Sequence, residues 1–340
     1  MTSSKNVWVF IEQESGKIAD VSLELLAKAD ELAQTLGGQV WGLLCGHKVS
    51  NLAASVIHYG ADRVLVADHS ELEIYRTLPY TRVAVDLVRE HQPDIFLIGA
   101  TPLGRDLAPR LASALQVGLT ADCTDLQIGD YNFRMEKRIY TDLLYQIRPA
   151  FGGNIVATIV NPKTRPQMAT VREGVMQANP PDPDRQGAVE FVTPTFQPED
   201  FALKVLRREQ RESDVNLKDA AVIVAGGAGA DEPEDFQLIR ELAHILGGEV
   251  GATRAAVDAG FISAEHQIGQ TGVTVRPRLY IAAGISGAIQ HRTGMEEANK
   301  IVAINTDPDA PIFEVADYKI VGDLREVIPM MIQALREKAR

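Results

Sequence analysis

Short apolar runs alternate with helical repeats along most of this chain, and this alternation is the feature that most restricts its fold. Val7–Ile11 (VWVFI) and Ile95–Gly99 (IFLIG) have the length and apolar content of buried strands, whereas Val21–Leu36 repeats its apolar residues at helical spacing. Strands that alternate with helices pair in parallel, because each helix crosses back over the sheet. The pattern therefore predicts an α/β fold with helices on both faces of a parallel sheet.

The first series of strands and helices ends near residue 115. Its elements are predicted at Val7–Ile11, Val21–Leu36, Val40–Leu44, Leu52–Tyr59, Arg63–Ala67, Tyr80–His91, Ile95–Gly99 and Gly104–Leu115. From Leu119 to Val171 the apolar runs become shorter and more polar, and we expect them to extend the same sheet, partly as antiparallel strands. Within that segment, Arg148-Pro149 and Gly152-Gly153 predict a tight turn.

A second series begins at Ala221 and predicts a doubly wound domain with a five-stranded parallel sheet. Its elements are predicted at Ala221–Ala225, Glu234–Leu246, Val250–Ala252, Leu279–Ala283, Ile301–Asn305, Lys319–Val321 and Leu324–Lys338. Four of these strands end in Gly, Ser, Asn or Asp. Open parallel sheets bind ligands at that edge, so we expect a site there.

Length and composition divide the chain into two domains. Its 340 residues exceed what one hydrophobic core usually organises. A proline-rich, charged stretch between Asn179 and Asp219 separates the two series, with one added strand expected at Val189–Val192. We predict an N-terminal α/β domain over residues 1–205, a linker over residues 206–219 and a ligand-binding domain over residues 220–340.

The charge balance and the cysteines exclude several classes of protein. A net charge of −12 argues against a nucleic-acid binder, which needs clustered basic residues. Cys45 and Cys123 are far apart and support neither an iron–sulfur cluster nor a disulfide framework. The N-terminal segment MTSSKNVWVF has no features of a leader, and no run approaches the roughly 20 apolar residues of a membrane span. We therefore expect a cytoplasmic protein without membrane insertion.

Polar residues at the strand ends of the second domain are candidates for the site. Thr253-Arg254 follows a strand and has small neighbours, so Arg254 could lie over an aromatic ring; a surface salt bridge, the usual fate of arginine, is the alternative. The Gln270-Thr271-Gly272 turn offers a hydroxyl and backbone donors. Asn305 and Asp323 end two further strands and could meet a ribose or adenine group.

Two glycine-containing turns could hold a phosphate. The turn Gly226–Gly229 (GGAG) follows a strand and precedes a helix, but it matches neither GxGxxG nor a Walker A loop, and a plain turn explains it equally well. Ser286-Gly287-Ala288 is predicted to begin a helix with a capping hydroxyl, and a simple helix cap is again the alternative. Gln290 and His291 favour a site here, although His291 alone would more often be structural.

Six segments of the second domain occur together over Ala221–Leu324: VGATRAAVDAGF, QIGQTG, LYIAAGISGAIQH, VAIN, DAPIFEVADY and IVGDL. In this order and spacing they resemble the FAD domain of the electron transfer flavoprotein alpha subunit. The first-domain segments GATPLGRDLAPRLA, RPAFGGN and RPQMATVR resemble that family more loosely. The resemblance implies an FAD cofactor and an electron transfer flavoprotein beta subunit as partner, since the family is a heterodimer with its flavin in a cleft between the subunits. The N-terminal domain, residues 1–205, would then be a scaffold that packs against this partner.

Carried over position by position, the resemblance implies roles for single residues. Thr253 and Ser286 would meet the FAD pyrophosphate, Arg254 would lie against the isoalloxazine ring, Thr271 would hydrogen-bond flavin N5, and His291 would approach the flavin C2 carbonyl. Asn305, Asp323 and Leu324 would hold the adenosine end. The full implied set is Gly227, Ala228, Thr253, Arg254, Ile268, Gly269, Gln270, Thr271, Ser286, Gly287, Ala288, Ile289, Gln290, His291, Asn305, Asp323 and Leu324.

Ala228 departs from the family pattern. The family commonly has Gly-Gly-Arg-Gly in this turn, whereas this chain has Gly226-Gly227-Ala228-Gly229. A positive charge that would pair with the pyrophosphate is missing, so we expect backbone N–H groups and helix dipoles to carry more of the binding. Thr253 replaces the more frequent Ser and keeps the hydroxyl.

The resemblance implies an electron-carrier subunit rather than a stand-alone enzyme. It would move single electrons between acyl-CoA dehydrogenase-type flavoenzymes and a second redox partner, with the charge of Arg254 favouring the negatively charged flavin. The segments GLTADCT and HQIGQTG resemble forms common in anaerobic members that bifurcate electrons from NADH to ferredoxin, which leaves bifurcation open. A non-redox module that binds a nucleotide or a CoA ester is the alternative of another class. An adenine-nucleotide hydrolase in the first domain has no phosphate loop to support it.

Overall fold

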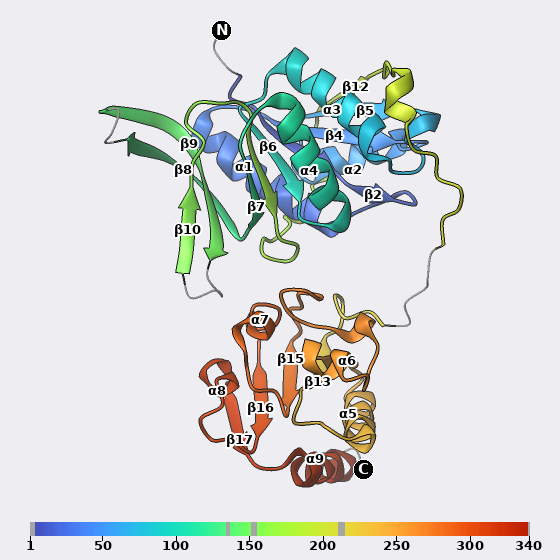
Figure 1. The fold of residues 1–340 in the computed structure, drawn as a ribbon, viewed down its shortest axis with the longest axis vertical. Helices are drawn as coiled ribbons and strands as arrows, with labels where there is room; N and C mark the ends of the chain where they lie inside the picture. The colour runs from blue at the N-terminus through green and yellow to red at the C-terminus, as the bar shows by residue number, and fades with distance from the viewer. Residues whose placement is uncertain (1–3, 134–136, 151–154, 210–214, 339–340) are drawn as a thin grey trace. The chain divides into compact units, whose positions relative to one another are not determined.

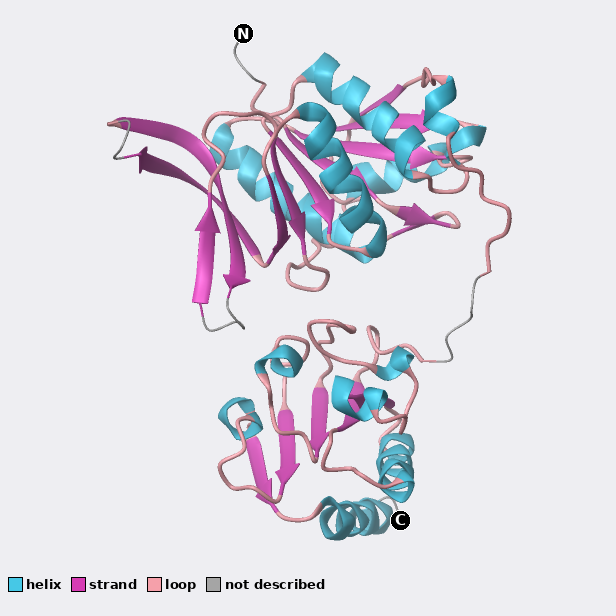
Figure 2. Cartoon of the chain, in the orientation of Figure 1, coloured by secondary structure: helices cyan, strands magenta, loops and turns pink. Residues whose placement is uncertain are grey.

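The structure is a computed structural model that describes residues 4–133, 137–150, 155–209 and 215–338. The chain divides into two compact units, Met1–Arg208 and Glu209–Arg340. Figure 1 traces both units, and Figure 2 shows that each combines strands with helices. Each unit has its own parallel sheet and its own hydrophobic clusters.

A seven-stranded parallel sheet forms the centre of the first unit. In order across the sheet its strands are β12 (Ala188–Phe191), β5 (Arg63–Asp68), β4 (Val40–Gly46), β1 (Val7–Ile11), β6 (Ile95–Gly99), β11 (Gln167–Val171) and β7 (Leu119–Cys123). Its helices are α1 (Asp20–Leu36), α2 (Ala53–His58), α3 (Thr77–His91) and α4 (Pro102–Leu115). Successive residues of β1 point to opposite faces, so Val7 and Val9 pack with α1 and α2, and Trp8 and Phe10 with α3 and α4. The predicted parallel sheet with helices on both faces is confirmed.

The segment from Leu119 to Val171 departs from the prediction. Its first and last strands, β7 and β11, join the main sheet, and both pair in parallel. The strands between them, β8 (Asp125–Phe133), β9 (Arg138–Ala150) and β10 (Ile155–Ile159), form a separate three-stranded antiparallel sheet. The prediction that the whole segment extends one sheet is wrong, because alternation along a strand does not specify the partner with which it pairs.

Arg148 and Pro149 also differ from the prediction, since both lie inside β9 rather than in a turn. Pro149 is tolerated there because the pairing of β8 with β9 stops at Ile147, which leaves Pro149 paired on one side only, with Val156 of β10. Gly152-Gly153 lies outside the described residues. Figure 1 shows the sheet β8–β9–β10 extending away from the helices of the first unit.

The second unit is built on a five-stranded parallel sheet. In order its strands are β14 (Glu249–Ala252), β13 (Val222–Gly226), β15 (Leu279–Ala283), β16 (Ile301–Asn305) and β17 (Tyr318–Val321). Its helices are α5 (Pro233–Ile245), α6 (Arg254–Asp258), α7 (Ile289–Arg292), α8 (Ile312–Val315) and α9 (Leu324–Lys338). Val224 and Ile281 pack with α5 and α9 on one face, while Ala225 and Tyr280 pack with α8 on the other. The predicted doubly wound five-stranded sheet is confirmed.

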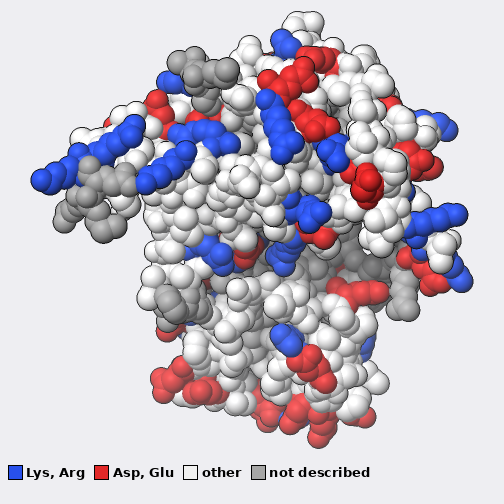
Figure 3. All heavy atoms as spheres, turned by 45° about the horizontal axis from the view of Figure 1, so that its top comes forward, with Lys and Arg blue, Asp and Glu red and all other residues white. Residues whose placement is uncertain are grey.

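The remaining described elements are short. They are β2 (Gln13–Glu14), β3 (Lys17–Ile18) and the 3₁₀ turns η1 (Ser50–Leu52), η2 (Ser70–Leu72), η4 (Pro198–Phe201) and η5 (Ala264–His266). Cys45 and Cys123 are both buried as free thiols, and burial raises the pKa of each to about 12. Among the described residues, no helix has the length and apolar content that crossing a membrane requires. Figure 3 shows Lys and Arg interspersed with Asp and Glu over the first unit, and acidic side chains gathered at the lower edge of the second.

Candidate functional site

A pocket of about 380 Å³ lies where β13, β14 and β15 of the second unit end. The strand order reverses here, because β14 lies on one side of β13 and β15 on the other. Open parallel sheets bind ligands at such points, where the loops diverge and leave a crevice. The lining residues are Ala228, Thr253, Arg254, Ala255, Asp258, Ile268, Gly269, Gln270, Thr271, Ile285, Ser286, Ala288, Gln290 and His291. Most of them are predicted site residues, so the fold brings together residues from four separate segments.

Thr253 and Arg254 form one wall of the pocket, at the start of α6. The Thr253 hydroxyl oxygen accepts a hydrogen bond from the backbone N–H of Ala256 at 3.4 Å and caps the helix. The Arg254 side chain is 68% exposed, and its Nε lies 3.2 Å from Oδ2 of Asp258, one helical turn later. An exposed pair of this kind contributes less than about 1 kcal/mol. Arg254 therefore makes a surface ion pair that it can leave for a ligand at small cost.

The loop from Ile268 to Gly272 also contributes to the pocket, which its residues Ile268 to Thr271 line. The Gln267 side-chain amide donates to the Thr271 hydroxyl oxygen at 2.9 Å, which leaves the Thr271 O–H free to donate to a ligand. The backbone N–H of Gln270 donates to the Gln290 carbonyl at 2.6 Å and docks the loop on α7. Gly269 has φ +136°, and a Cβ there would lie 2.7 Å from that same carbonyl. Only glycine allows this close approach.

The loop after β15 supplies unpaired backbone donors. Within the described part of the chain, the N–H groups of Ser286, Gly287 and Ala288 have no hydrogen-bond acceptor. Gly287 has φ +87°, and N–H groups next to a left-handed residue can converge on one anion. The prediction that Ser286 caps a helix is wrong, because the backbone at Gly287 is left-handed and α7 begins only at Ile289, without a side-chain cap.

The turn after β13 contributes less than its glycines indicate. The N–H groups of Gly227 and Gly229 donate to the carbonyls of Ala283 and Gly284 at 3.0 and 2.9 Å. A Cβ at Gly227 would lie 2.3 Å from the Gly284 carbonyl oxygen, so glycine is needed for two strand ends to approach. Of this turn, Ala228 lines the pocket. These glycines therefore fasten β13 to β15 rather than present a row of donors to a ligand.

His291 lies at the floor of the pocket and is 6% exposed. Its Nε2 is 2.9 Å from the Tyr280 hydroxyl and its Nδ1 is 3.0 Å from the Ile268 carbonyl oxygen. Burial lowers the pKa of His291 to about 4, with the bond to the Ile268 carbonyl opposing that shift. The imidazole is therefore neutral at pH 7, and both of its nitrogens have partners inside the protein.

The predicted adenosine-end residues Asn305, Asp323 and Leu324 do not line this pocket. Asn305 donates to the Ile285 carbonyl at 2.9 Å and so supports the loop that carries the unpaired donors. Asp323 accepts from the backbone N–H of Arg325 at 2.8 Å at the start of α9, and Leu324, the first residue of that helix, is buried in the core. Gly287 and Ile289, also predicted, are neighbours of lining residues but do not line the pocket themselves.

Sequence reasoning missed three contributors to the site. Asp258 lies four residues after Arg254, a spacing that signals a helical ion pair once the helix is known. No sequence pattern marked Ile285 or Tyr280 as a site residue, because both look like ordinary core residues in and just after a strand. Tyr280 is fully buried, and only the fold brings its hydroxyl to His291.

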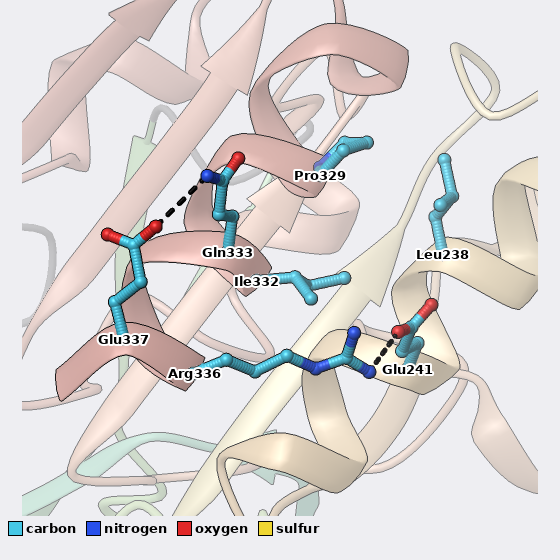
Figure 4. Close-up of a pocket in the computed structure, with 7 residues that line it drawn as sticks. All are labelled: Leu238, Glu241, Pro329, Ile332, Gln333, Arg336 and Glu337. Atoms are coloured by element: carbon cyan, nitrogen blue, oxygen red, sulfur yellow. Dashed lines mark hydrogen bonds and ion pairs between the residues drawn. The ribbon is translucent and has the colours of Figure 1, made fainter. Parts of the chain in front are cut away.

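A second hollow, of about 430 Å³, lies between α5 and α9. Figure 4 shows its polar groups paired with one another: Arg336 reaches Glu241 across the hollow at 2.8 Å, and Gln333 donates to Glu337 at 3.0 Å. Leu238 and Ile332 supply apolar walls. Although this hollow is larger, its polar side chains bind one another and it collects no predicted site residue, so the pocket at the strand ends is the better candidate site.

Comparison with known proteins decides the family. The electron transfer flavoprotein domain matches residues 7–196, and the electron transfer flavoprotein FAD-binding domain matches residues 216–296. The electron transfer flavoprotein subunit alpha of Thermoanaerobacterium thermosaccharolyticum is 49% identical over 99% of both chains. The chain belongs to the electron transfer flavoprotein alpha subunit family. The Megasphaera elsdenii subunit alpha is 46% identical over 98% of this chain and 97% of its own, and the acryloyl-CoA reductase electron transfer subunit beta of Anaerotignum propionicum is 42% identical over 99% and 97%.

The pocket of this family member fits the flavin that the family's second domain binds. The unpaired N–H groups of Ser286, Gly287 and Ala288 suit the oxygens of a pyrophosphate. Arg254 and Thr271 both line the pocket, and a cation and a hydroxyl group suit the polar edge of a flat ring. Arg254 can meet a ligand without a large rearrangement because its ion pair is exposed. Thr271 can do so because its hydroxyl proton has no acceptor among the described residues. Ala228 lines the pocket without a charged side chain, as the sequence indicates.

Proposed function

We propose that this chain is the FAD-carrying alpha subunit of a heterodimeric electron transfer flavoprotein. It carries single electrons between acyl-CoA dehydrogenase-type flavoenzymes, or NADH, and a second redox acceptor in the cytoplasm. The flavin supplies the electron chemistry when bound. The protein binds it, orients it and sets its potential.

The observation that carries this proposal is the convergence of three kinds of group on one pocket. A cation, Arg254, and a free hydroxyl proton, Thr271, line the pocket of a domain that matches an FAD-binding family model. Ser286 and Ala288 line the same pocket, and their backbone N–H groups, like that of Gly287 between them, have no acceptor among the described residues. A flavin dinucleotide needs donors for its pyrophosphate and polar partners for its ring, and these groups supply both.

A beta subunit is the proposed partner of the first unit. The sheet β8–β9–β10 exposes large apolar side chains, with Ile139 at 63%, Ile155 at 54% and Val156 at 64% exposure. Ile139 lies near one end of β9, and Ile155 and Val156 pair with its other end, so exposed apolar side chains occur at both ends of this sheet and support a protein–protein contact along it. Replacing Ile139 and Val156 with Ser should weaken co-purification of the two subunits without unfolding the chain. Unchanged co-purification would exclude this sheet from the interface.

The direct test is the visible spectrum of the chain co-expressed with its beta subunit. A yellow heterodimer that releases FAD on denaturation is expected, and Thr271→Val together with Arg254→Ala should lower the retained flavin. A colourless heterodimer would refute the proposal. It would instead favour the alternative, a module that binds a nucleotide or a CoA ester without redox turnover.

Bifurcation of electrons from NADH to ferredoxin is the finer form of this proposal. Its support is the resemblance of GLTADCT and HQIGQTG to bifurcating members, together with relatives from anaerobes. The same heterodimer tests it through flavin content and NADH-dependent reduction of ferredoxin. More than one flavin with ferredoxin reduction would establish bifurcation. One FAD with no such activity would leave simple electron transfer.

A further inference from the structure

His291 and Tyr280 form a closed hydrogen-bonded pair beneath the pocket. Tyr280 is fully buried in β15, and its hydroxyl lies 2.9 Å from Nε2 of His291. The other ring nitrogen, Nδ1, lies 3.0 Å from the Ile268 carbonyl oxygen. A carbonyl oxygen can only accept, so Nδ1 must carry a proton. In a neutral ring Nε2 is then the acceptor, and the Tyr280 O–H donates to it.

The surroundings of the ring favour that neutral form. A doubly protonated His291 would turn the Tyr280 hydroxyl into an acceptor and leave its proton without a partner among the described residues. The charged groups on the pocket wall are Arg254 and Asp258, which pair with each other and are mostly exposed. No carboxylate bonds to the ring in the described structure, so an imidazolium would lack compensation.

His291 is also the anchor of the loop that presents Thr271. Its Nδ1–H holds the carbonyl of Ile268, the first residue of that loop. Next to this bond, the backbone N–H of Gln270 donates to the Gln290 carbonyl at 2.6 Å, and a Cβ at Gly269 would lie 3.2 Å from Cα of His291. Three successive residues, Ile268, Gly269 and Gln270, thus contact α7 immediately before Thr271.

We propose that Tyr280 and His291 are a positioning pair for this loop. The Tyr280 hydroxyl holds His291 as the neutral Nδ1–H tautomer, and His291 holds Ile268 so that the Thr271 hydroxyl is aimed into the pocket. The family resemblance implies that His291 approaches the flavin C2 carbonyl; in this arrangement the ring has no proton left to donate to that group. This inference rests on the proposed function only in naming the flavin as the ligand.

The tautomer can be observed without a flavin. Long-range ¹H–¹⁵N correlation spectra of the full chain, labelled in histidine, distinguish the two neutral tautomers and the imidazolium. We expect His291 to carry its proton on Nδ1 alone at pH 7. A proton on Nε2, or on both nitrogens, would overturn the proposal, and His291→Gln identifies the signal by its disappearance.

The effect on the loop is measured by amide hydrogen exchange and by the flavin. In Tyr280→Phe we expect exchange of the Gln270 amide to accelerate at least tenfold, while amides of β13 keep their rates and show that the unit is still folded. His291→Gln retains a donor and an acceptor and should keep slow exchange, whereas His291→Leu should lose it. Unchanged exchange in both Tyr280→Phe and His291→Leu would refute the positioning role.

Reconstitution with FAD separates this inference from the proposed function. In the heterodimer, the one-electron potential of the flavin should move in His291→Leu and be restored in His291→Gln. If the chain binds no flavin but shows the Nδ1–H tautomer and the loop effect, the proposed function fails and the positioning pair stands. If flavin binds and the tautomer is Nε2–H, the pair alone is refuted.

Discussion

Lowering the pH should destabilise the second unit through His291. Burial lowers the pKa of this imidazole to about 4, whereas an unfolded chain has a histidine pKa of about 6.5. Between these values the unfolded chain binds a proton that the folded chain does not, so acid favours unfolding. The stability that neutral His291 contributes is complete above about pH 6.5 and is lost as the pH falls toward about 4.

The magnitude follows from the two pKa values. A difference of about 2.5 pKa units corresponds to roughly 3 kcal/mol at most, since one unit is about 1.4 kcal/mol. Between pH 8 and pH 5 the linkage relation gives a loss of about 2 kcal/mol from this group. That loss is a large fraction of the stability of an ordinary domain.

The assay compares the chain with His291→Gln in urea unfolding at pH 8 and pH 5. Glutamine keeps a donor for Ile268 and an acceptor for Tyr280 but does not titrate, so its stability should fall by about 2 kcal/mol less over this interval. Trp8 and Trp41 both lie in the first unit, so tryptophan emission follows that unit as an internal control while far-UV circular dichroism follows both. Parallel losses in the two proteins would refute the reasoning.

Four further substitutions probe the pocket and the packing of the second unit. Arg254→Ala should lower the one-electron potential of the bound flavin by about 60 mV, or about 1.4 kcal/mol, because it removes a positive charge. Asp258→Asn should raise that potential, because it frees the Arg254 charge from its ion pair. A spectroelectrochemical titration that shows no change in either variant would exclude Arg254 as a determinant of the flavin potential. Gly269→Ala should lose most of its flavin, because its Cβ would meet the backbone of α7; full flavin stoichiometry would contradict this. Asp235→Ala should lower the free energy of unfolding in urea by about 1–3 kcal/mol, because Asp235 caps α5 and binds Arg325 of α9 at 2.9 Å. Glu234→Ala, at an exposed neighbouring position, is the control and should change the free energy of unfolding little.

Most of the fold could be predicted from the chain because its signals are local. The strands Val7–Ile11, Ile95–Gly99 and Leu279–Ala283 have the bounds that their apolar runs indicate. Parallel pairing could be predicted from the helices that separate successive strands. That inference does not require knowing which side chains meet. The separate sheet β8–β9–β10 was not predicted, because the alternation of residues along a strand is the same whichever sheet the strand joins.

Sequence motifs indicated most of the residues that line the pocket, but not their hydrogen-bond partners, burial or protonation. Ser286 and Thr253 look alike as hydroxyls before a helix, yet Thr253 caps α6 while the left-handed backbone of Gly287 separates Ser286 from α7. The glycines at 227 and 229 look like phosphate-binding positions, yet their N–H groups are taken by the end of β15. Hydrogen-bond partners of this kind come from segments distant in the chain, which no local pattern records.

The sequence by itself determined the element order, the two parallel sheets and the segments that line the pocket, because periodicity and strand-end residues act within a few positions of one another. Only the tertiary structure decided that His291 is buried against Tyr280, that Arg254 pairs with the exposed Asp258 and that the N–H groups of Ser286 to Ala288 find no acceptor among the residues the structure describes. These properties depend on burial and on which polar groups meet across the fold. The physical reason is that the protonation and hydrogen bonding of a group are set by its surroundings, and the surroundings exist only once the chain has folded.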